Sequence, residues 1–170
     1  MEIPLVYSDY FQSYLDLVPK EYNLLESLEI SLHETIHFVQ DVPMHAFDYR
    51  YAPGKWTIKE IVQHLIDCER VYSYRALSIA RKDPQTLLGF DENLFANTVS
   101  NQASTRPLKG LLEEYSMARH STIQMFKSFD QEALSQVGSA SVFNYNVAAI
   151  GWILIGHEKH HLQVFKERYL

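Results

Sequence analysis

Two histidines near the end of the sequence, His157 and His161, carry the first chemical signal in the chain. Their spacing of four residues places both imidazoles on one face of an α-helix, about one turn apart. On a helical wheel this face coincides with the apolar stripe of the same segment, which contains Ile150, Leu154, Val164 and Phe165. An unpaired polar group that faces a core is costly. Either a metal ion shared by both imidazoles or a pair of core hydrogen bonds would supply the missing partners.

A third histidine, His64, lies on another predicted helix, at the edge of its apolar stripe. From that position the imidazole side chain can point towards the interior of the protein. Together with His157 and His161 it would form a facial set of three ligands on one divalent ion, which leaves positions for water or substrate. Such an ion would acidify a bound water or thiol. The alternative for His64 is a half-buried, hydrogen-bonded histidine.

Two charged residues also fall on predicted core faces. Arg119 lies inside the apolar stripe of its helix, and Glu69 lies inside the stripe of the helix that carries His64. A guanidinium inside a bundle needs a partner. We therefore expect an Arg119–Glu69 ion pair, with binding of a substrate carboxylate by Arg119 as the alternative role.

Glu158 and Cys68 are the remaining polar or reactive candidates near the histidines. Glu158 stands at the stripe's edge, where it would orient a ligand imidazole or act as a general base; a solvated helix face is the other interpretation. Cys68 is most simply a small core residue, with a nucleophilic role as the less favoured alternative. His160 lies too far from the stripe to be a ligand.

A di-iron site is a further alternative, because Glu34 with His37, and Glu158 with His161, have the Glu-x-x-His spacing of di-iron bundles. That site would need all four side chains to point inward. Glu34 and His37 lie opposite the apolar face of their helix, so the sequence disfavours it.

Helices must position these side chains, and the hydrophobic periodicity predicts four long ones. They cover about residues 19–40, 57–81, 107–129 and from Asn144 or Asn146 almost to the end of the sequence. Thr57 with Glu60 has the pattern of a capping box. We expect a short helix near residues 91–97 and a helical turn within 130–138, whereas no stretch alternates as a strand does. The pattern predicts an all-α four-helix bundle.

Bulk properties agree with one domain spanning residues 1–170. The chain has 170 residues, of which 46% are hydrophobic, and a formal net charge of −6. This charge disfavours nucleic acid as a partner. The single cysteine excludes an internal disulfide, as suits a cytoplasmic protein. The sequence begins without the features of a signal peptide, and its longest apolar run, residues 147–155, is too short to span a membrane.

Two segments resemble one known family, the DinB/YfiT-like superfamily. The first is Tyr51-Ala52-Pro53-Gly54-Lys55-Trp56-Thr57-Ile58-Lys59-Glu60-Ile61-Val62-Gln63-His64-Leu65, which is similar to the family segment that enters the second helix. The second is Gly156-His157-Glu158-Lys159-His160-His161, which matches the family's histidine pair. The resemblance covers nearly the whole chain, including the Phe90-Asp91 connector and the Arg119 region.

The resemblance implies a four-helix bundle with long crossover connections and short extra helices. It implies one divalent metal held by His64, His157 and His161, with zinc or nickel favoured and iron, manganese or copper also accommodated. Family members include transferases that use low-molecular-weight thiols, a thiol-dependent isomerase and a suggested hydrolase. We therefore expect a cytoplasmic, homodimeric thiol transferase that acts on a small molecule. A metal-dependent hydrolase and a non-catalytic metal- or ligand-binding stress protein are the alternatives.

Overall fold

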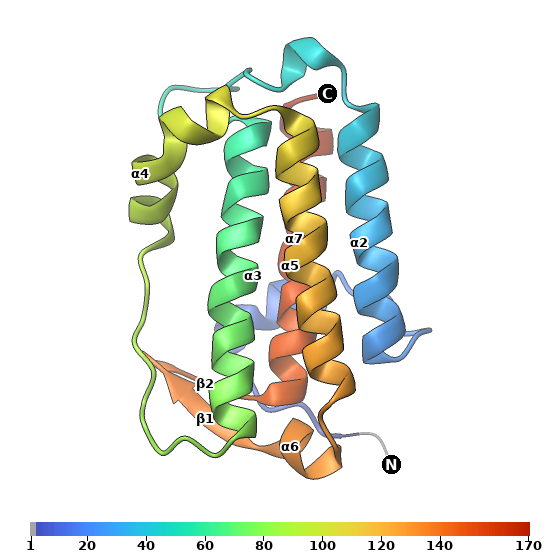
Figure 1. Cartoon of the computed structure of the whole chain (residues 1–170), viewed down its shortest axis with the longest axis vertical. Coiled ribbons are helices and arrows are strands. Elements are labelled where there is room, and N and C mark those ends of the chain that lie inside the picture. The colour runs from blue at the N-terminus through green and yellow to red at the C-terminus, as the bar shows by residue number, and fades with distance from the viewer. Residues whose placement is uncertain (1–2) are drawn as a thin grey trace.

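The computed structural model describes residues 3–170, and its architecture is a bundle of four long helices (Figure 1). The four are α2 (Leu24–Asp41), α3 (Ile58–Ala80), α5 (Leu108–Lys127) and α7 (Val147–Arg168). Helices α2 and α3 each pack against both α5 and α7. The predicted all-α four-helix bundle is therefore confirmed in its main elements.

The order of the helices creates a long crossover. In Figure 1, α2 and α7 run upward, whereas α3 and α5 both run downward, so residues 81–107 must return along the bundle from the end of α3 to the start of α5. Helix α4 (Glu92–Thr105) lies in this crossover and packs against α3. Asp91 caps it by accepting hydrogen bonds from the backbone N–H groups of Asn93 and Leu94.

Caps explain where the long helices begin. Thr57 and Glu60 form the predicted capping box at the start of α3. The prediction that the first long helix begins at residue 19 was wrong, because Asn23 and Glu26 form a second capping box and α2 starts only at Leu24. Of the two predicted caps for the last helix, Asn146 is the one used, since its side chain accepts a hydrogen bond from the backbone N–H of Ala149.

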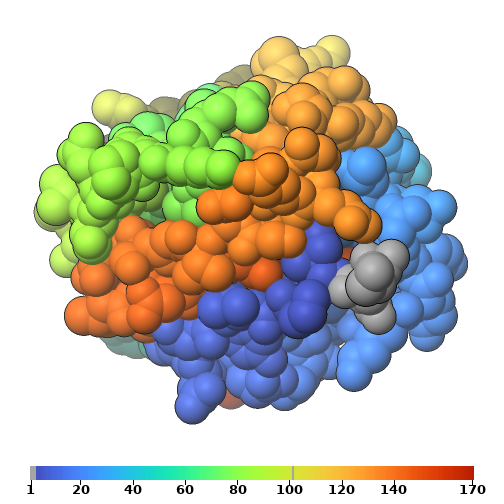
Figure 2. All heavy atoms as spheres, turned by 90° about the horizontal axis from the view of Figure 1, so that it is seen from below, coloured from blue at the N-terminus to red at the C-terminus, as the bar shows by residue number. Residues whose placement is uncertain are grey.

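A small hairpin was missed by the sequence prediction. Strands β1 (Val137–Ala140) and β2 (Phe143–Asn146) pair antiparallel between α7 and the short helix α6 (Gln131–Ser135). Together with α6 they lie at one end of the bundle (Figure 1), and the short helices η1 (Asp9–Phe11) and α1 (Gln12–Leu15) follow from there to the middle of α7, where α1 packs against Gly156. Seen from that end, the N-terminal segment in blue lies against the α6 and hairpin region in orange (Figure 2).

The bundle core consists of two apolar clusters with a polar layer between them. One cluster includes Leu28, Ile123 and Ile150, and the other includes Leu32, Leu111 and Phe165. The helical turns between them bury the polar side chains of His64, Glu69, Arg119, His157, Glu158 and His161. Most of the chemistry identified in the sequence is thereby gathered in one layer of the bundle. Among the described residues, no helix is long and apolar enough to cross a membrane.

Candidate metal centre

Three imidazoles from two helices meet in the polar layer. His64 is on α3, and His157 and His161 lie one turn apart on α7. The Nε2 atom of His157 lies 3.1 Å from Nε2 of His64 and 3.0 Å from Nε2 of His161. The ring centroids of His64 and His161 are 5.0 Å apart. All three side chains are buried, so the three rings converge on one point inside the protein.

Hydrogen bonding between the imidazoles accounts for only one of the two close nitrogen contacts. A neutral imidazole nitrogen either donates one proton or accepts with one lone pair. Nε2 of His157 therefore makes one good hydrogen bond, and its second close nitrogen neighbour is left without one. Two nitrogens bound to one tetrahedral zinc ion lie about 3.3 Å apart, because each Zn–N distance is about 2.0–2.1 Å. The observed separations fit a shared divalent ion.

Burial keeps the three imidazoles in the form that binds metals. It lowers the pKa of His64 to about 4. Burial, followed by the neighbouring histidines, holds the pKa values of His157 and His161 well below the ordinary value for imidazole. All three rings are thus neutral near pH 7, and neutral imidazole is the ligating form.

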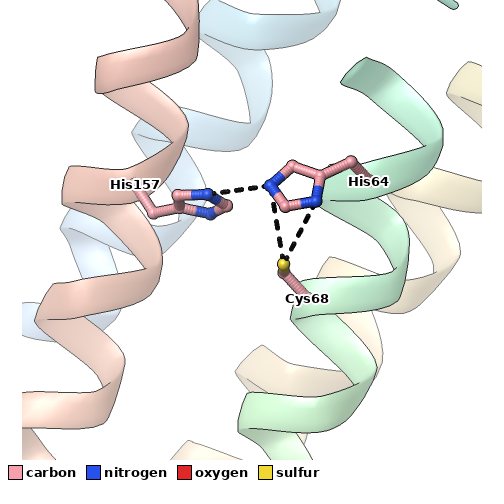
Figure 3. Close-up of side chains that lie close together, drawn as sticks. All are labelled: His64, Cys68 and His157. Atoms are coloured by element: carbon pink, nitrogen blue, oxygen red, sulfur yellow. Dashed lines mark hydrogen bonds between the residues drawn. The ribbon is translucent and has the colours of Figure 1, made fainter. Parts of the chain in front are cut away.

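Cys68, expected from the sequence to be a small core residue, lies beside the histidines. It lies one turn after His64 on α3, with its Sγ 3.6 Å from Nδ1 and 3.7 Å from Nε2 of that histidine (Figure 3). The donor atoms of His64, Cys68 and His157 all lie within 4.8 Å of one another. The protein thus contains a candidate His–Cys–His metal site. The spacing of four between His64 and Cys68, the same as in the C-terminal histidine pair, was the available signal.

Arg119 lies in an ion-pair cluster beside the histidines. Its Nε and Nη2 atoms lie 2.9 and 3.0 Å from the two carboxylate oxygens of Glu69, which confirms the predicted pair. Nη2 also lies 2.9 Å from Oε2 of Glu158. The structure shows the Glu158 side chain buried and hydrogen-bonded by Thr35, so a solvated face for Glu158 is excluded. The catalytic role of Glu158 and the substrate-binding role of Arg119 stay predictions.

The charges of this cluster do not cancel. Two carboxyl groups contact one guanidinium, so the buried cluster has one acidic group more than it has basic groups, and an uncompensated charge in the interior is costly. Glu158 directly follows His157 in α7, so the acidic group and two of the imidazoles belong to the same two turns of this helix. A divalent ion among these imidazoles would offset the excess acidic group, which is a second feature that fits a metal.

A small pocket lies against one of the three histidines, His157. Its walls include Tyr10, Tyr14, Tyr72 and Glu92, and it reaches Cys68 and His157. Its volume of about 20 Å³ is sufficient for about one water molecule. Burial raises the pKa values of the Tyr14 and Tyr72 phenols, so both are neutral hydrogen-bond donors. Partial burial also raises the pKa of the Glu92 carboxyl group.

No pattern in the sequence singles out these pocket residues. Tyr72 is an aromatic residue of the kind that fills a core, and Glu92 lies in the crossover, whose path cannot be derived from helix periodicity. Tyr14 reaches the site because α1 packs tightly on α7: a Cβ atom at Gly156 would lie only 2.2 Å from the carbonyl oxygen of Tyr14. Glycine at position 156 therefore permits the contact that brings Tyr14 to the pocket.

The remaining candidates lie outside the centre. Glu34 and His37 are exposed on α2, and Glu34 pairs with Lys159 instead. The structure therefore excludes the di-iron arrangement based on Glu34 and His37. The ring of His160 contacts those of Tyr14 and His161 at centroid distances of 5.4 and 5.2 Å.

Fold and site define a helical bundle protein with a buried candidate metal centre. The chain belongs to the DinB superfamily, whose model matches residues 27–165. It is 24% identical over 147 residues to a protein of Oceanobacillus iheyensis named "Putative metal-dependent hydrolase OB0413", covering 84% of this chain and 79% of the relative. Among solved structures it matches that of Bacillus subtilis YfiT, described as "a probable metal-dependent hydrolase with an unusual four-helix bundle topology". This match has a TM-score of 0.73 and 16% identity, and it covers 88% of this chain and 89% of YfiT.

Proposed function

We propose that the protein is a divalent-metal-dependent hydrolase whose metal ligands are His64, His157 and His161. The observation that carries the proposal is the convergence of the three neutral imidazoles beside a pocket with room for a water molecule. The names of the relatives support hydrolysis as the reaction class. Zinc or nickel suits three imidazole ligands, and cellular availability decides between such metals.

The ion, when bound, would supply Lewis acidity that makes a ligated water a nucleophile near neutral pH. The residues of this chain then have separate tasks. Glu92, an exposed residue that lines the pocket, accepts a proton, and burial shifts its pKa upward, which makes the carboxylate a stronger base. Tyr14 and Tyr72 donate hydrogen bonds to a substrate oxygen. The pairing of Glu158 with Arg119 fixes the turn of α7 that carries the two C-terminal histidines.

Transfer of a low-molecular-weight thiol is the second candidate function. One observation favours it: Cys68 shows that a sulfur atom fits beside His64. A thiol bound in such a position would be deprotonated by the ion, and a thiolate is the nucleophilic form. A homodimer and a cytoplasmic location stay predictions for either function.

Metal analysis tests the ligand set. The untagged full chain, reconstituted with zinc or nickel, is expected to hold about one ion per chain by mass spectrometry. The separate variants His64→Ala, His157→Ala and His161→Ala should each lose stoichiometric binding. His37→Ala is the matched control, because His37 is an exposed histidine on α2. A variant at any of the three positions that keeps the wild-type affinity would remove that residue from the ligand set.

Activity assays then separate the two reactions. Metal-loaded protein is tested on ester and amide substrates, and in parallel on a low-molecular-weight thiol with an electrophile. For hydrolysis we expect Glu92→Gln to lower kcat about 10²- to 10⁴-fold while metal content is unchanged. Product formation that requires the added thiol would favour transfer instead. Hydrolysis at the same rate in the metal-free chain would contradict the proposed function.

A further inference from the structure

We infer that Cys68 is a fourth protein ligand, so that the resting metal centre has three imidazole nitrogens and one thiolate. The inference rests on the metal centre of the proposed function and adds a donor that the three-histidine set lacks. Cys68 is almost fully buried, on the same face of α3 as His64 and one turn away. Its sulfur therefore lies in the polar layer with the imidazoles, as Figure 3 shows for His64 and His157.

The distances from Cys68 to His64 agree with coordination of one ion by both residues. With Zn–S about 2.3 Å and Zn–N about 2.0–2.1 Å, a sulfur and a nitrogen on one tetrahedral ion lie about 3.6 Å apart. The sulfur of Cys68 lies 3.7 Å from Nε2 of His64, the same nitrogen that faces His157. A weak hydrogen bond from the thiol to Nδ1 of His64, 3.6 Å away, is the competing explanation. That explanation gives the sulfur no contact with a metal, so the two can be separated by experiment.

A fourth protein ligand would change how a reactant reaches the ion. Cys68 and His157 both line the pocket, so the thiolate lies on the side from which a reactant arrives. An incoming water, thiol or carbonyl oxygen must then displace Cys68 or bind as a fifth ligand. The thiolate also lowers the net charge of the centre from +2 to +1, which weakens its Lewis acidity until displacement. Cys68 thus masks the ion in the resting protein.

The coordination step balances without an oxidant or reductant. The S–H bond of Cys68 breaks, the proton passes to solvent and the sulfur–metal bond forms. Displacement by substrate reverses these changes, because the freed sulfur takes up a proton. The oxidation states of sulfur and metal stay the same throughout.

Cobalt substitution tests the inference on the full chain, because Co²⁺ bound to a thiolate has a near-ultraviolet charge-transfer band. The chain contains one cysteine, so in thiol-free buffer this band can arise only from Cys68. We expect the band in the wild type at one cobalt per chain. Cys68→Ala and Cys68→Ser should lose the band, keep the visible cobalt bands, and bind the ion at least about tenfold more weakly. Tyr72→Phe, one turn further along α3, is the matched control and should keep the band.

A second measurement avoids substitution altogether. X-ray absorption of the zinc-loaded wild type should show one sulfur neighbour at about 2.3 Å. Visible cobalt bands without a charge-transfer band, or a zinc shell without sulfur, would overturn the role of Cys68 while leaving the three-histidine centre intact. A wild-type chain that binds no cobalt or zinc would instead overturn the metal centre itself.

Discussion

Replacing Arg119 by methionine should destabilise the fold severely. The guanidinium is 1% exposed and contacts the carboxylates of Glu69 and Glu158, which are also buried. Removing one member of a buried ion pair costs about 3–5 kcal/mol, because the partner is left as an uncompensated charge. Arg119→Met leaves two carboxyl groups without their partner, so we expect the free energy of unfolding to fall by about 5 kcal/mol. The total free energy of unfolding of a single domain is about 5–15 kcal/mol.

Urea unfolding of the metal-free chain, followed by circular dichroism, measures this loss. Arg70→Met is the matched control, because Arg70 pairs with Glu114 at the surface and such a pair contributes less than about 1 kcal/mol. Adding Glu69→Gln to Arg119→Met removes one of the unpaired charges and should restore part of the stability.

A specific result would refute this reasoning. If Arg119→Met were no less stable than Arg70→Met, the ion-pair cluster would not support the fold. A rise of KM for carboxylate substrates alone, with stability unchanged, would then assign Arg119 to substrate binding.

Three further outcomes are expected. Metal-free protein should become less stable as the pH falls from about 6.5 towards 4, because the unfolded chain gains a proton on His64 that the folded protein does not bind. His64 alone should lower the free energy of unfolding by up to about 1.4 kcal/mol per pH unit. Urea unfolding at several pH values across this range measures the change. Thr57→Ala should lower the free energy of unfolding by about 1 kcal/mol, because the cap at the start of α3 is lost; urea unfolding measures this change. An unchanged urea midpoint would mean that the cap does not stabilise the fold. Gly156→Ala should cost about 1–3 kcal/mol in thermal unfolding, because the new Cβ would collide with the backbone of Tyr14. Gly110→Ala is its control: a Cβ there meets no atom within 4 Å, so stability should be unchanged or up to about 1 kcal/mol higher.

Helix faces and the three histidines were predictable because a bundle core imposes a period of 3.6 residues on its helices. His64, at the edge of its stripe, is buried as expected, and the pairing of Arg119 with Glu69 followed from placing both on inward faces. The role of Cys68 was obscured by its residue type, because a cysteine within an apolar stripe resembles any small core residue.

Elements held by distant contacts were not predictable. Strand β1 consists of Val-Gly-Ser-Ala, which has no hydrophobic alternation, and its backbone is held partly by Leu87 from the crossover. Helix α4 extends to Thr105, beyond the predicted limit near residue 97, although among its described side chains Ala96 and Ala103 are the only well-buried apolar ones. Two alanines are too weak a stripe to indicate a helix.

The position of α7 in the chain has a consequence for synthesis. It is the last of the four long helices to leave the ribosome, yet it packs against α1, α2 and α3. A nascent chain that stops before α7 exposes the apolar faces of the earlier helices, which makes it prone to aggregation. It also lacks His157 and His161, two of the three converging imidazoles. The core and the candidate metal centre are therefore completed by the same helix, and a partly made chain can form neither.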